Sequence, residues 1–353
     1  MQFDPTPISN KNCENLIGSV EIPVGVVGPL TIHGIYLEKP VYVPLATTEG
    51  ALVASTNRGM KAMQQAGGAN TIVINHGMSR APVFRCKDAQ TAHNLQTWIQ
   101  QHWKEIASAA ETTSAHLQLT NFHSWIIGRH LYTRFTAKTG EAMGMNMLSI
   151  ALNAMIQSII LPQWNNKAEL ISLSSNLCTD KKENGINHVL GRGYWAQAEV
   201  IIPTQLVEEI LKTSPEEIVR VHVQKNLVGS AIAGSPSQNA HVANIVAAMF
   251  LATGQDPAHI VEGAFAYTSM EEDDNGLYAA VTIPNLNIGT IGGGTYLDKF
   301  TEARKLISEN LTPTQLAGVI AATALAGELS LIAALSTNTL ACAHQALGRM
   351  TEQ

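Results

Sequence analysis

The segment CTDKK places Asp180 beside Lys181 and Lys182 in a chain in which only 14% of residues are charged. Two adjacent ammonium groups repel each other, so a compensating anion is expected nearby. Most Lys-Lys pairs lie on solvated loops, where counter-ions fill that role. Here the neighbours are Ser, Asn, Cys and Gly, which favours a loop folded over an anionic ligand.

Two carboxylates occupy positions from which they could donate or accept protons. Glu49 lies in TTEG, in the first turn of an expected helix. Asp256 lies in GQDP, between a helix-ending glycine and a proline that imposes an extended backbone. The Asp256 carboxylate is either a simple turn former or a rigidly positioned acid or base. His344, on the last expected helix, would titrate near neutrality, although a lone helical histidine is more often structural.

The first expected helix carries a face that could bind anions. Ser55, Arg58 and Lys61 recur every three residues and therefore share one face. Gly59 lies between the two cations and costs the helix about 1 kcal/mol relative to Ala, which a helix tolerates when another group must approach closely. A phosphate or a coenzyme A-like tail would fit this face, and a salt-bridged surface fits it equally well. Arg80, in HGMSRAP, lies in an expected turn from which it could fork onto a carboxylate.

The segment GEAMGMNML places Met143, Met145 and Met147 at alternate positions around a glycine. A spacing of two makes no stripe on a helix, so these side chains would surround its first turn. They are either adaptable core filling or a helix start that packs a flat ring and binds anions through free N–H groups. The glycine loop GTIGGGT (289–295) is compatible with phosphate binding, but it lacks the GxGxxG pattern of nucleotide-binding strand–turn–helix folds.

Helix and strand patterns alternate along the chain that must position these residues. Residues 14–34 have Gly or Pro every few positions and predict strands and turns, and the polar segment 174–189 predicts a loop. Helices are predicted at 47–68, capped by a threonine, and at 238–253. The alternation favours an α+β or α/β fold with a middle segment inserted into a larger domain.

The composition excludes several classes of function. The 353 residues carry a net charge of −6 and no Lys/Arg block, which argues against nucleic acid or an anionic membrane as partner. Four cysteines without CxxC or Cys/His ligand spacing predict reduced thiols and no metal site. The N-terminus has no signal-peptide pattern. Apolar segments such as LAGVIAATALAG are interrupted by Glu328 and are too short to span a bilayer. We therefore expect a soluble cytoplasmic protein, and the low charge favours burial of surface between subunits.

Eight motifs, in this order, resemble those of 3-hydroxy-3-methylglutaryl-CoA reductase: ENLIGSVEIPVGVVGPL, TTEGALVASTNRG, GMSRAP, EAMGMNM, CTDKK, KNLVGSAIAGS, GQDP and GTIGGGT. The likeness extends from about Cys13 to Arg349 and looks like the class I form, without the N-terminal membrane region of animal and plant enzymes. It implies the four-electron reduction of hydroxymethylglutaryl-CoA to mevalonate and CoA, with two hydrides from a nicotinamide cofactor.

The resemblance also implies four catalytic residues, and the chemistry of the reaction accounts for each type. The Lys181 ammonium would stabilise the alkoxide that forms when hydride attacks the thioester. His344 would protonate the departing CoA thiolate, and Glu49, as a protonated acid, would supply the proton for the second reduction. Asp256 would link Glu49 with Lys181 and hold their protonation states apart.

The remaining matches imply three groups of binding residues. The residues expected around the hydroxymethylglutaryl group are Arg80, Ser174, Asp180, Lys182, Lys225 and Asn244. The residues expected to face CoA are Ser55, Asn57, Arg58, Lys61 and Lys212. The residues expected against the dinucleotide are Ser114, Glu141, Met143, Gly144, Met145, Asn146, Gly292 and Gly293. On this basis the methionine segment is a cofactor-facing helix start rather than core filling.

Three positions depart from the family pattern. Glu141 stands where the family usually has Asp, which preserves the charge. Ala115 stands where NADPH-dependent relatives carry an arginine that can pair with the 2′-phosphate, so the expected cofactor is NADPH with NADH as the alternative. Met350 stands where animal and plant enzymes carry a phosphorylatable serine, so regulation of that kind is expected to be absent.

The resemblance implies an α+β fold with two domains. After an N-terminal segment (1–17), a large mixed helix and sheet domain that binds substrate and CoA is expected at 18–80 and 185–353. A small non-Rossmann, ferredoxin-like NAD(P)-binding domain is expected at 82–172, followed by a catalytic loop at 173–184. Family members assemble active sites between subunits, which implies a homodimer or homotetramer. Two alternatives stay open: a CoA-thioester-binding protein without turnover, and the same enzyme run in reverse to degrade mevalonate with NAD.

Overall fold

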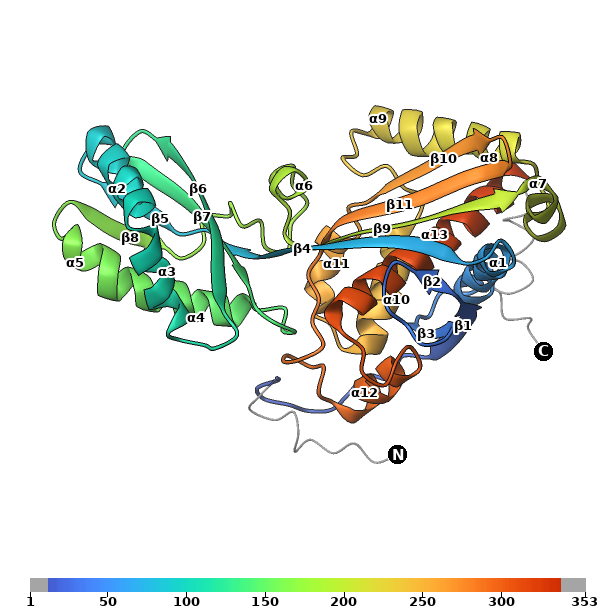
Figure 1. Ribbon diagram of the computed structural model, residues 1–353, viewed down its shortest axis with the longest axis horizontal. Helices are drawn as coiled ribbons and strands as arrows, with labels where there is room; N and C mark the ends of the chain where they lie inside the picture. Colours follow the sequence, from blue (N-terminus) through green and yellow to red (C-terminus); the bar gives the residue numbers. More distant parts are fainter. Residues whose placement is uncertain (1–11, 338–353) are drawn as a thin grey trace. The chain divides into compact units, whose positions relative to one another are not determined.

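The chain folds into two compact units, seen in a computed structural model that describes residues 12–337 (Figure 1). Unit 1 consists of the described residues up to Ile74 and those from Trp195 onward, and unit 2 consists of Asn75–Tyr194. Unit 2 therefore includes residues 173–184, which the sequence pattern set apart as a loop. Each unit contains both helices and strands, so the prediction of a mixed helix and sheet fold is confirmed.

The main sheet of unit 1 has the strand order β10-β11-β9-β4. Its strands are β10 (Tyr267–Asp273), β11 (Gly276–Leu286), β9 (Gly193–Pro203) and β4 (Ala69–Arg80). β10 and β11 form an antiparallel hairpin in which Asp273 pairs with Gly276, and the Asp273 carboxylate accepts a hydrogen bond from the Asn275 backbone N–H at 2.9 Å. The loop between the two strands is therefore Asp274–Asn275, and an Asp side chain that accepts from the backbone N–H two residues further on stabilises such a turn.

A second, smaller sheet contains the first strands of the chain. β1 (Val24–Leu30) and β3 (Val41–Ala46) pair antiparallel as a two-stranded sheet, and β2 (Ile32–His33) pairs parallel with the start of β4. The helical segments of unit 1 are α1 (Leu52–Gln65), α7 (Thr204–Leu206), the π-helical turn η2 (Val207–Leu211), α8 (Pro215–His222), the π-helical η3 (Val223–Gly229), α9 (Ser230–Ala233), α10 (Val242–Thr253), the 3₁₀ turn η4 (Pro257–His259), α11 (Ile260–Gly263), α12 (Asp298–Lys305) and α13 (Pro313–Ser336).

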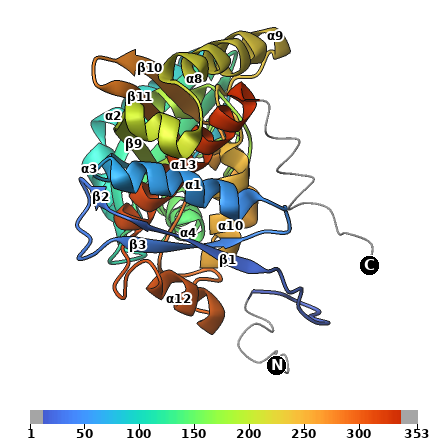
Figure 2. The same ribbon diagram turned by 90° about the vertical axis from the view of Figure 1, so that its right-hand side faces the viewer.

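The core of unit 1 is built around α13, which contacts α1, α10, α8 and β11 (Figure 2). Thr312 and Gln315 form a capping box at its start, and the following residues are apolar on all sides, as expected of a buried helix. The close approach of α1 depends on Gly59, because a Cβ at that position would lie 1.9 Å from the Ala326 carbonyl oxygen. The group that approaches Gly59 in this structure is thus another helix of unit 1.

The sequence pattern misjudged the extent of several helices. α13 has 24 residues, so the prediction that its apolar segment is too short for a membrane span is wrong. By length and composition, two described helices could cross a membrane: α13 and the Met145–Gln163 helix. In α13, the 18-residue stretch that is apolar enough to cross a membrane is 94% buried within the protein. α1 begins at Leu52, after Ala51 in a left-handed conformation, so neither predicted threonine caps it.

Unit 2 has the order strand, helices, two strands, helix, strand. Its strands are β5 (Val83–Cys86), β6 (Gln118–Ile127), β7 (His130–Lys138) and β8 (Ala168–Ser172). Its helices are α2 (Ala89–Gln101), α3 (Trp103–Glu111), α4 (Met145–Met155), the π-helical turn η1 (Ile156–Ile160), α5 (Leu161–Gln163) and α6 (Ile186–Leu190). β6 pairs with β7, β7 with β5, and β5 with β8, all antiparallel, and Met78–Arg80 of β4 also pair with β7.

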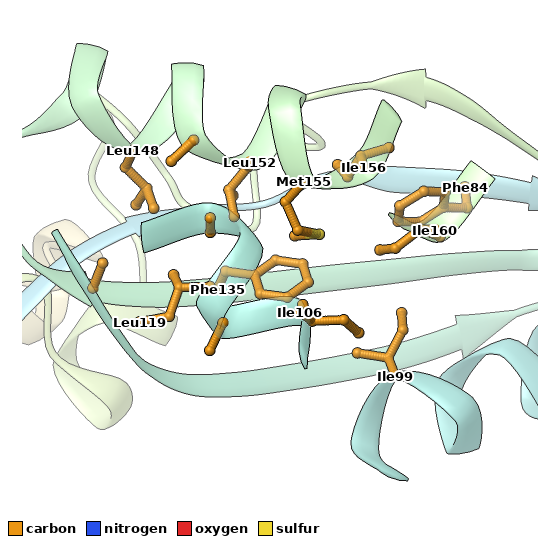
Figure 3. Packing of buried hydrophobic residues seen from close by; sticks show 14 of the residues in the cluster. Phe84, Ile99, Ile106, Leu119, Phe135, Leu148, Leu152, Met155, Ile156 and Ile160 are labelled. Atoms are coloured by element: carbon orange, nitrogen blue, oxygen red, sulfur yellow. The ribbon is translucent and has the colours of Figure 1, made fainter. Parts of the chain in front are cut away.

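The core of unit 2 lies between this sheet and its helices (Figure 3). Leu148, Leu152 and Met155 of α4 recur at helical spacing and point toward Phe135 of β7. Alternate residues of a strand face the same side, so Leu131, Phe135 and Ala137 of β7 all belong to this core, whereas Arg134 is on the opposite face. This packing fixes β7 and the start of α4, which are the elements that carry the predicted cofactor segment.

Candidate functional site

The predicted catalytic residues are divided between the two units. Glu49 and Asp256 belong to unit 1, and Lys181 belongs to unit 2. His344 lies outside the described residues.

In unit 1, the structure brings Glu49 and Asn244 together. Glu49 is exposed in the loop before α1, and its backbone N–H donates to the Thr47 hydroxyl at 3.0 Å. The Asn244 side-chain amide donates to the Glu49 carboxylate at 3.3 Å and lies equally close to His241 Nδ1. Residues from two distant parts of the chain thus form one polar group at the start of α10.

The start of α10 is held by a buried carboxylate that the sequence pattern treated only as a break in an apolar segment. Glu328 of α13 has no solvent exposure and accepts hydrogen bonds from the backbone N–H groups of Ala240 and His241 at 2.7 Å each. The Thr268 hydroxyl donates to the same carboxylate at 2.7 Å. A negative charge beside the free N–H groups at a helix start is favourable. Glu328 therefore fixes the residues that lead to Asn244.

The predicted CoA-facing residues of α1 have partners within unit 1. The Arg58 guanidinium donates to the hydroxyl and the carbonyl oxygen of Ser330 at 3.0 and 2.6 Å, and Ser55 donates to the same hydroxyl at 2.9 Å. Burial lowers the pKa of Arg58. Asn57 accepts a hydrogen bond from the Gly28 backbone N–H at 3.0 Å. The other two predicted CoA-facing cations, Lys61 and Lys212, are exposed, as is Lys225, which is predicted to lie near the hydroxymethylglutaryl group.

Asp256 ends the loop after α10 and begins a row of three ionisable side chains. Its carboxylate accepts a hydrogen bond from the Ala258 backbone N–H at 3.0 Å, which caps the turn η4. His259 is fully buried, with Nε2 3.7 Å from the Asp256 carboxylate and Nδ1 3.1 Å from the Glu262 carboxylate. The sequence pattern identified Asp256 but gave no signal for His259 or Glu262, because their approach depends on the tight turn.

The glycine loop of unit 1 exposes its backbone. Gly292 and Gly293 have φ values of 81° and 59°, and a Cβ at either position would meet nothing within 4 Å. The Asn12 side-chain amide donates to the Gly293 carbonyl oxygen at 3.0 Å. An open glycine backbone allows a ligand to approach more closely than any side chain would permit.

In unit 2, the loop that carries Lys181 has a strained backbone. Asn176, Thr179 and Lys181 have positive φ values of 66°, 48° and 61°. L-residues other than Asn and Asp rarely adopt this conformation, which costs about 1–2 kcal/mol per residue. The Ser174 hydroxyl lies 3.3 Å from the buried Cys178 thiol. Strain of this kind persists only where surrounding contacts hold it in place.

Asp180 is the charged anchor of this loop. Its carboxylate accepts a hydrogen bond from the buried Arg192 guanidinium at 2.9 Å and lies 3.8 Å from Arg80. The Lys182 ammonium donates to the Asp180 carbonyl oxygen at 2.9 Å. The structure thus brings three of the predicted substrate-binding residues together and adds Arg192, which the sequence pattern missed.

A second buried arginine, Arg134 of β7, lies beneath the same loop. It is 1% exposed and donates to the carbonyl oxygens of Leu177 and Gly191 at 2.5 and 2.8 Å, and to the Asn187 side-chain oxygen at 2.9 Å. Burial, with a smaller contribution from Arg192, lowers the pKa of Arg134 to about 10. Nothing in the sequence marks this residue as buried, because a charge in an alternating strand is normally solvent-facing.

The predicted cofactor segment forms the turn before α4. Gly144 has a φ of 92°, and a Cβ there would lie 2.3 Å from the Thr139 side chain, so only glycine fits. The Thr139 hydroxyl donates to the Ala142 carbonyl oxygen at 2.8 Å and closes the turn. Met145 is 9% exposed and belongs to the core, and Met143 packs against that core. Glu141 and Asn146 are exposed, and the Ser114 hydroxyl accepts from the His116 backbone N–H at 3.2 Å.

The chain matches the family described as hydroxymethylglutaryl-coenzyme A reductase over residues 1–349. The 3-hydroxy-3-methylglutaryl-coenzyme A reductase of Pyrococcus horikoshii is 45% identical over 356 residues, covering 98% of this chain and 86% of its own. Reductase 2 of Dictyostelium discoideum is 43% identical over 363 residues, covering 99% and 68%. A solved class II reductase from Streptococcus pneumoniae, bound to NADPH in open conformations, has a TM-score of 0.72 at 19% identity and covers 92% and 87%.

Proposed function

Because the chain belongs to the hydroxymethylglutaryl-coenzyme A reductase family, we propose that it reduces 3-hydroxy-3-methylglutaryl-CoA to mevalonate and CoA. The observation that carries this proposal is the match at 45% identity over 98% of the chain. The protein is on this basis an oxidoreductase of the mevalonate pathway. Within unit 1, hydrogen bonds hold the carboxylates of Glu49 and Asp256, and within unit 2 an ion pair holds that of Asp180.

The reaction turns a thioester into an alcohol and therefore consumes two hydrides. Each reduced nicotinamide dinucleotide, when bound, would supply one hydride, so the reaction uses two of them. NADPH is the expected cofactor, since the Streptococcus pneumoniae relative is bound to NADPH, and NADH stays an alternative because Ala115 offers no cation to a 2′-phosphate. The open backbone at Gly292 and Gly293 and the tight turn at Gly144 are compatible with such a ligand. The absence of a metal stays a prediction.

The side chains of this chain would then divide the remaining chemistry. Lys181 stabilises the oxyanion that forms at the thioester carbon. His344 protonates the departing thiolate, and Glu49 protonates the second alkoxide. Asp256, fixed by the Ala258 N–H, sets the protonation state of its neighbours. The Asn244 amide donates to the Glu49 carboxylate and helps to hold this side chain in position.

We assign the binding roles by the same reasoning. Around the hydroxymethylglutaryl group these are Arg80, Ser174, Asp180, Lys182, Lys225 and Asn244, and toward CoA they are Ser55, Asn57, Arg58, Lys61 and Lys212. The contacts of Arg58 and Ser55 with Ser330 support a rigid α1 surface rather than flexible side chains.

Unit 2 is proposed to be a ferredoxin-like domain that binds the dinucleotide. The support is its order of strand, helix, strand, strand, helix, strand, and the spatial strand order β8-β5-β7-β6. We also propose that the protein is a class I-like enzyme and that it acts in the cytoplasm as a homodimer or homotetramer.

The direct test is the initial rate of absorbance loss at the nicotinamide band, with hydroxymethylglutaryl-CoA and either NADPH or NADH. Turnover supports the reductase, and the faster cofactor decides the role of Ala115. Saturable CoA-thioester binding without turnover by the folded protein would instead support a binding protein. Faster mevalonate oxidation with NAD than reduction with either cofactor would support the degradative direction.

Lys181→Ala gives a sharper test of the site. Loss of the ammonium removes the proposed oxyanion partner, so kcat should fall by about 100-fold to 1,000-fold, with the fold preserved by far-UV circular dichroism. Lys61→Ala, on an exposed turn of α1, serves as the comparison and should affect the KM for the CoA thioester rather than kcat. Substantial kcat in the Lys181 variant would contradict the assigned role.

A further inference from the structure

One side chain of β7, Arg134, binds the loop that carries Lys181 on both sides of that lysine. Its guanidinium donates to the Leu177 carbonyl oxygen on one side of Lys181 and to the Gly191 carbonyl oxygen on the other. A third hydrogen bond reaches the side-chain oxygen of Asn187. The Asn187 backbone N–H is in turn held by Asn184 at 2.9 Å. One planar group therefore ties both ends and one interior turn of the loop to β7.

The loop needs such a restraint because its backbone is strained. Asn176, Thr179 and Lys181 have φ values between 48° and 66°, in the left-handed region that L-residues avoid. Without fixed ends, the loop would relax toward ordinary backbone angles, and the direction of the Lys181 side chain would change with them. The restraint and the strain are thus found in one segment.

The partners of Arg134 distinguish it from an ordinary ion pair. Its three acceptors are two backbone carbonyl oxygens and an amide oxygen, all neutral. The nearby carboxylate of Asp180 is bound by Arg192 instead. A buried charge with neutral partners contributes little attraction to offset its desolvation, whereas a forked, planar donor can bind several oxygens at fixed angles. The geometry is therefore that of a clamp, and a lysine could not reproduce it.

We propose that Arg134 is a positioning residue, which closes the Leu177–Gly191 loop and thereby sets the orientation of Lys181. This inference rests on the proposed function only for the role of Lys181. The restraint of the loop itself is independent of any reaction.

The test uses the full-length protein with Arg134→Gln and Arg134→Lys. The control is Arg85→Gln, since Arg85 lies on the neighbouring strand β5 and forms an exposed ion pair with Glu169 at 3.2 Å. Hydrogen exchange followed by mass spectrometry reports the protection of residues 176–190. Steady-state kinetics give kcat and the KM of the nicotinamide cofactor separately.

Both Arg134 variants should exchange faster in residues 176–190 while the exchange of α2 and α4 is unchanged. A displacement of about 1 Å at a reacting group can lower kcat by about 100-fold, so kcat should fall by about that factor with the cofactor KM preserved. Arg134→Lys should recover little of the lost protection or kcat. Arg85→Gln should match the wild type in both exchange and kcat. If Arg134→Gln does not fold, the lysine variant carries the same test.

Three results would be decisive in other ways. Wild-type protection of residues 176–190 in the variants would overturn the clamp, whatever the activity. Faster exchange with unchanged kcat would overturn the link to Lys181. The wild-type protein could lack reductase activity while the Arg134 variants still exchange faster. That result would support the clamp and count against the proposed function.

Discussion

Glu328 is a buried charge whose contacts lead to the proposed site. Its carboxylate accepts three hydrogen bonds, from Ala240, His241 and Thr268, all at 2.7 Å. His222 lies close enough for Glu328 to oppose the lowering of its pKa, which is caused mainly by burial. The charge is therefore part of a polar group inside the apolar core of unit 1.

Glu328→Gln should destabilise the protein and weaken turnover. The new amide places N–H donors opposite N–H donors, and an unsatisfied buried polar group costs about 1–3 kcal/mol. Urea unfolding should show a loss of that size in the free energy of unfolding. As a control, Glu309→Gln, at an exposed ion pair with Lys305, should change neither stability nor turnover. If Glu328→Gln also leaves both unchanged, the three hydrogen bonds of Glu328 are dispensable.

The histidines of the fold predict how stability depends on pH. Burial lowers the pKa of His188 to about 4 from its ordinary 6.5. Between these values the unfolded chain binds a proton at His188 and the folded chain does not, so the free energy of unfolding falls as the pH falls from about 6.5 toward about 4. With allowance for partial solvent exposure, this histidine contributes about 1 kcal/mol to the change.

Thermal melts across this pH range check the prediction. His188→Gln should reduce the slope of Tm against pH, and His93→Gln, on an exposed position of α2, should leave the slope as in the wild type. An unchanged slope in the His188 variant would mean that other groups cause the acid sensitivity.

At the scale of elements, the contact of α1 with α13 depends on a missing side chain. Gly59→Ala would add a Cβ 1.9 Å from the Ala326 carbonyl oxygen. The gain in helix propensity is about 1 kcal/mol, but separating two packed helices costs about 1–3 kcal/mol, so we expect a net loss of stability in chemical denaturation. Gly185→Ala, where a Cβ would meet nothing within 4 Å, is the matched control. Equal stability of the two variants would contradict the packing argument.

How much of this the sequence could predict differs between elements. Alternation of helix and strand patterns correctly indicated a mixed fold, because apolar spacing depends mainly on the local chain. The predicted start of α1 was wrong, because the sequence contains no signal for the left-handed conformation of Ala51. The predicted length of the apolar segment in α13 was wrong, because a glutamate such as Glu328 normally interrupts a buried helix. Its hydrogen-bond partners, which are far away in the sequence, allow it to be buried here.

The site shows the same division. Motif matches selected Asp180 and Glu49, and the structure joins each to other predicted residues, Arg80 and Asn244. The supporting residues Arg134 and Arg192 were missed. Their burial results from tertiary packing of the loop on β7, and a single strand pattern cannot distinguish such a charge from an exposed one.

At the scale of the whole molecule, the exposed apolar residues predict self-association. Val24 and Val26 on β1 and Tyr42 on β3 are 54%, 46% and 48% exposed, and Ile17 and Val20 in the preceding segment are more exposed still. Apolar surface gathered on one part of a chain marks an interaction site. This agrees with the low content of charged residues, 14%.

Light scattering after gel filtration should therefore give at least twice the 37.9 kDa mass of one chain. The double variant Val24→Asp and Val26→Asp should lower the mass, because charges in an apolar contact oppose association. Ile127→Asp, at an exposed position of β6 in unit 2, is the control. A wild-type mass of one chain would reject the homo-oligomer.

In the sequence, unit 2 separates the two parts of unit 1, and this order has a consequence for synthesis on the ribosome. α1 cannot find its partner α13 until roughly 250 further residues have been translated, which at roughly 5–20 residues per second takes roughly 12–50 s. During that interval Leu52, Met60 and Met63, which are buried in the finished protein, have no core to enter. Unit 2 is contiguous and can fold as soon as it emerges. The nascent chain thus carries a folded middle and an unpaired beginning, and we expect the N-terminal helix to be the segment that chaperones hold.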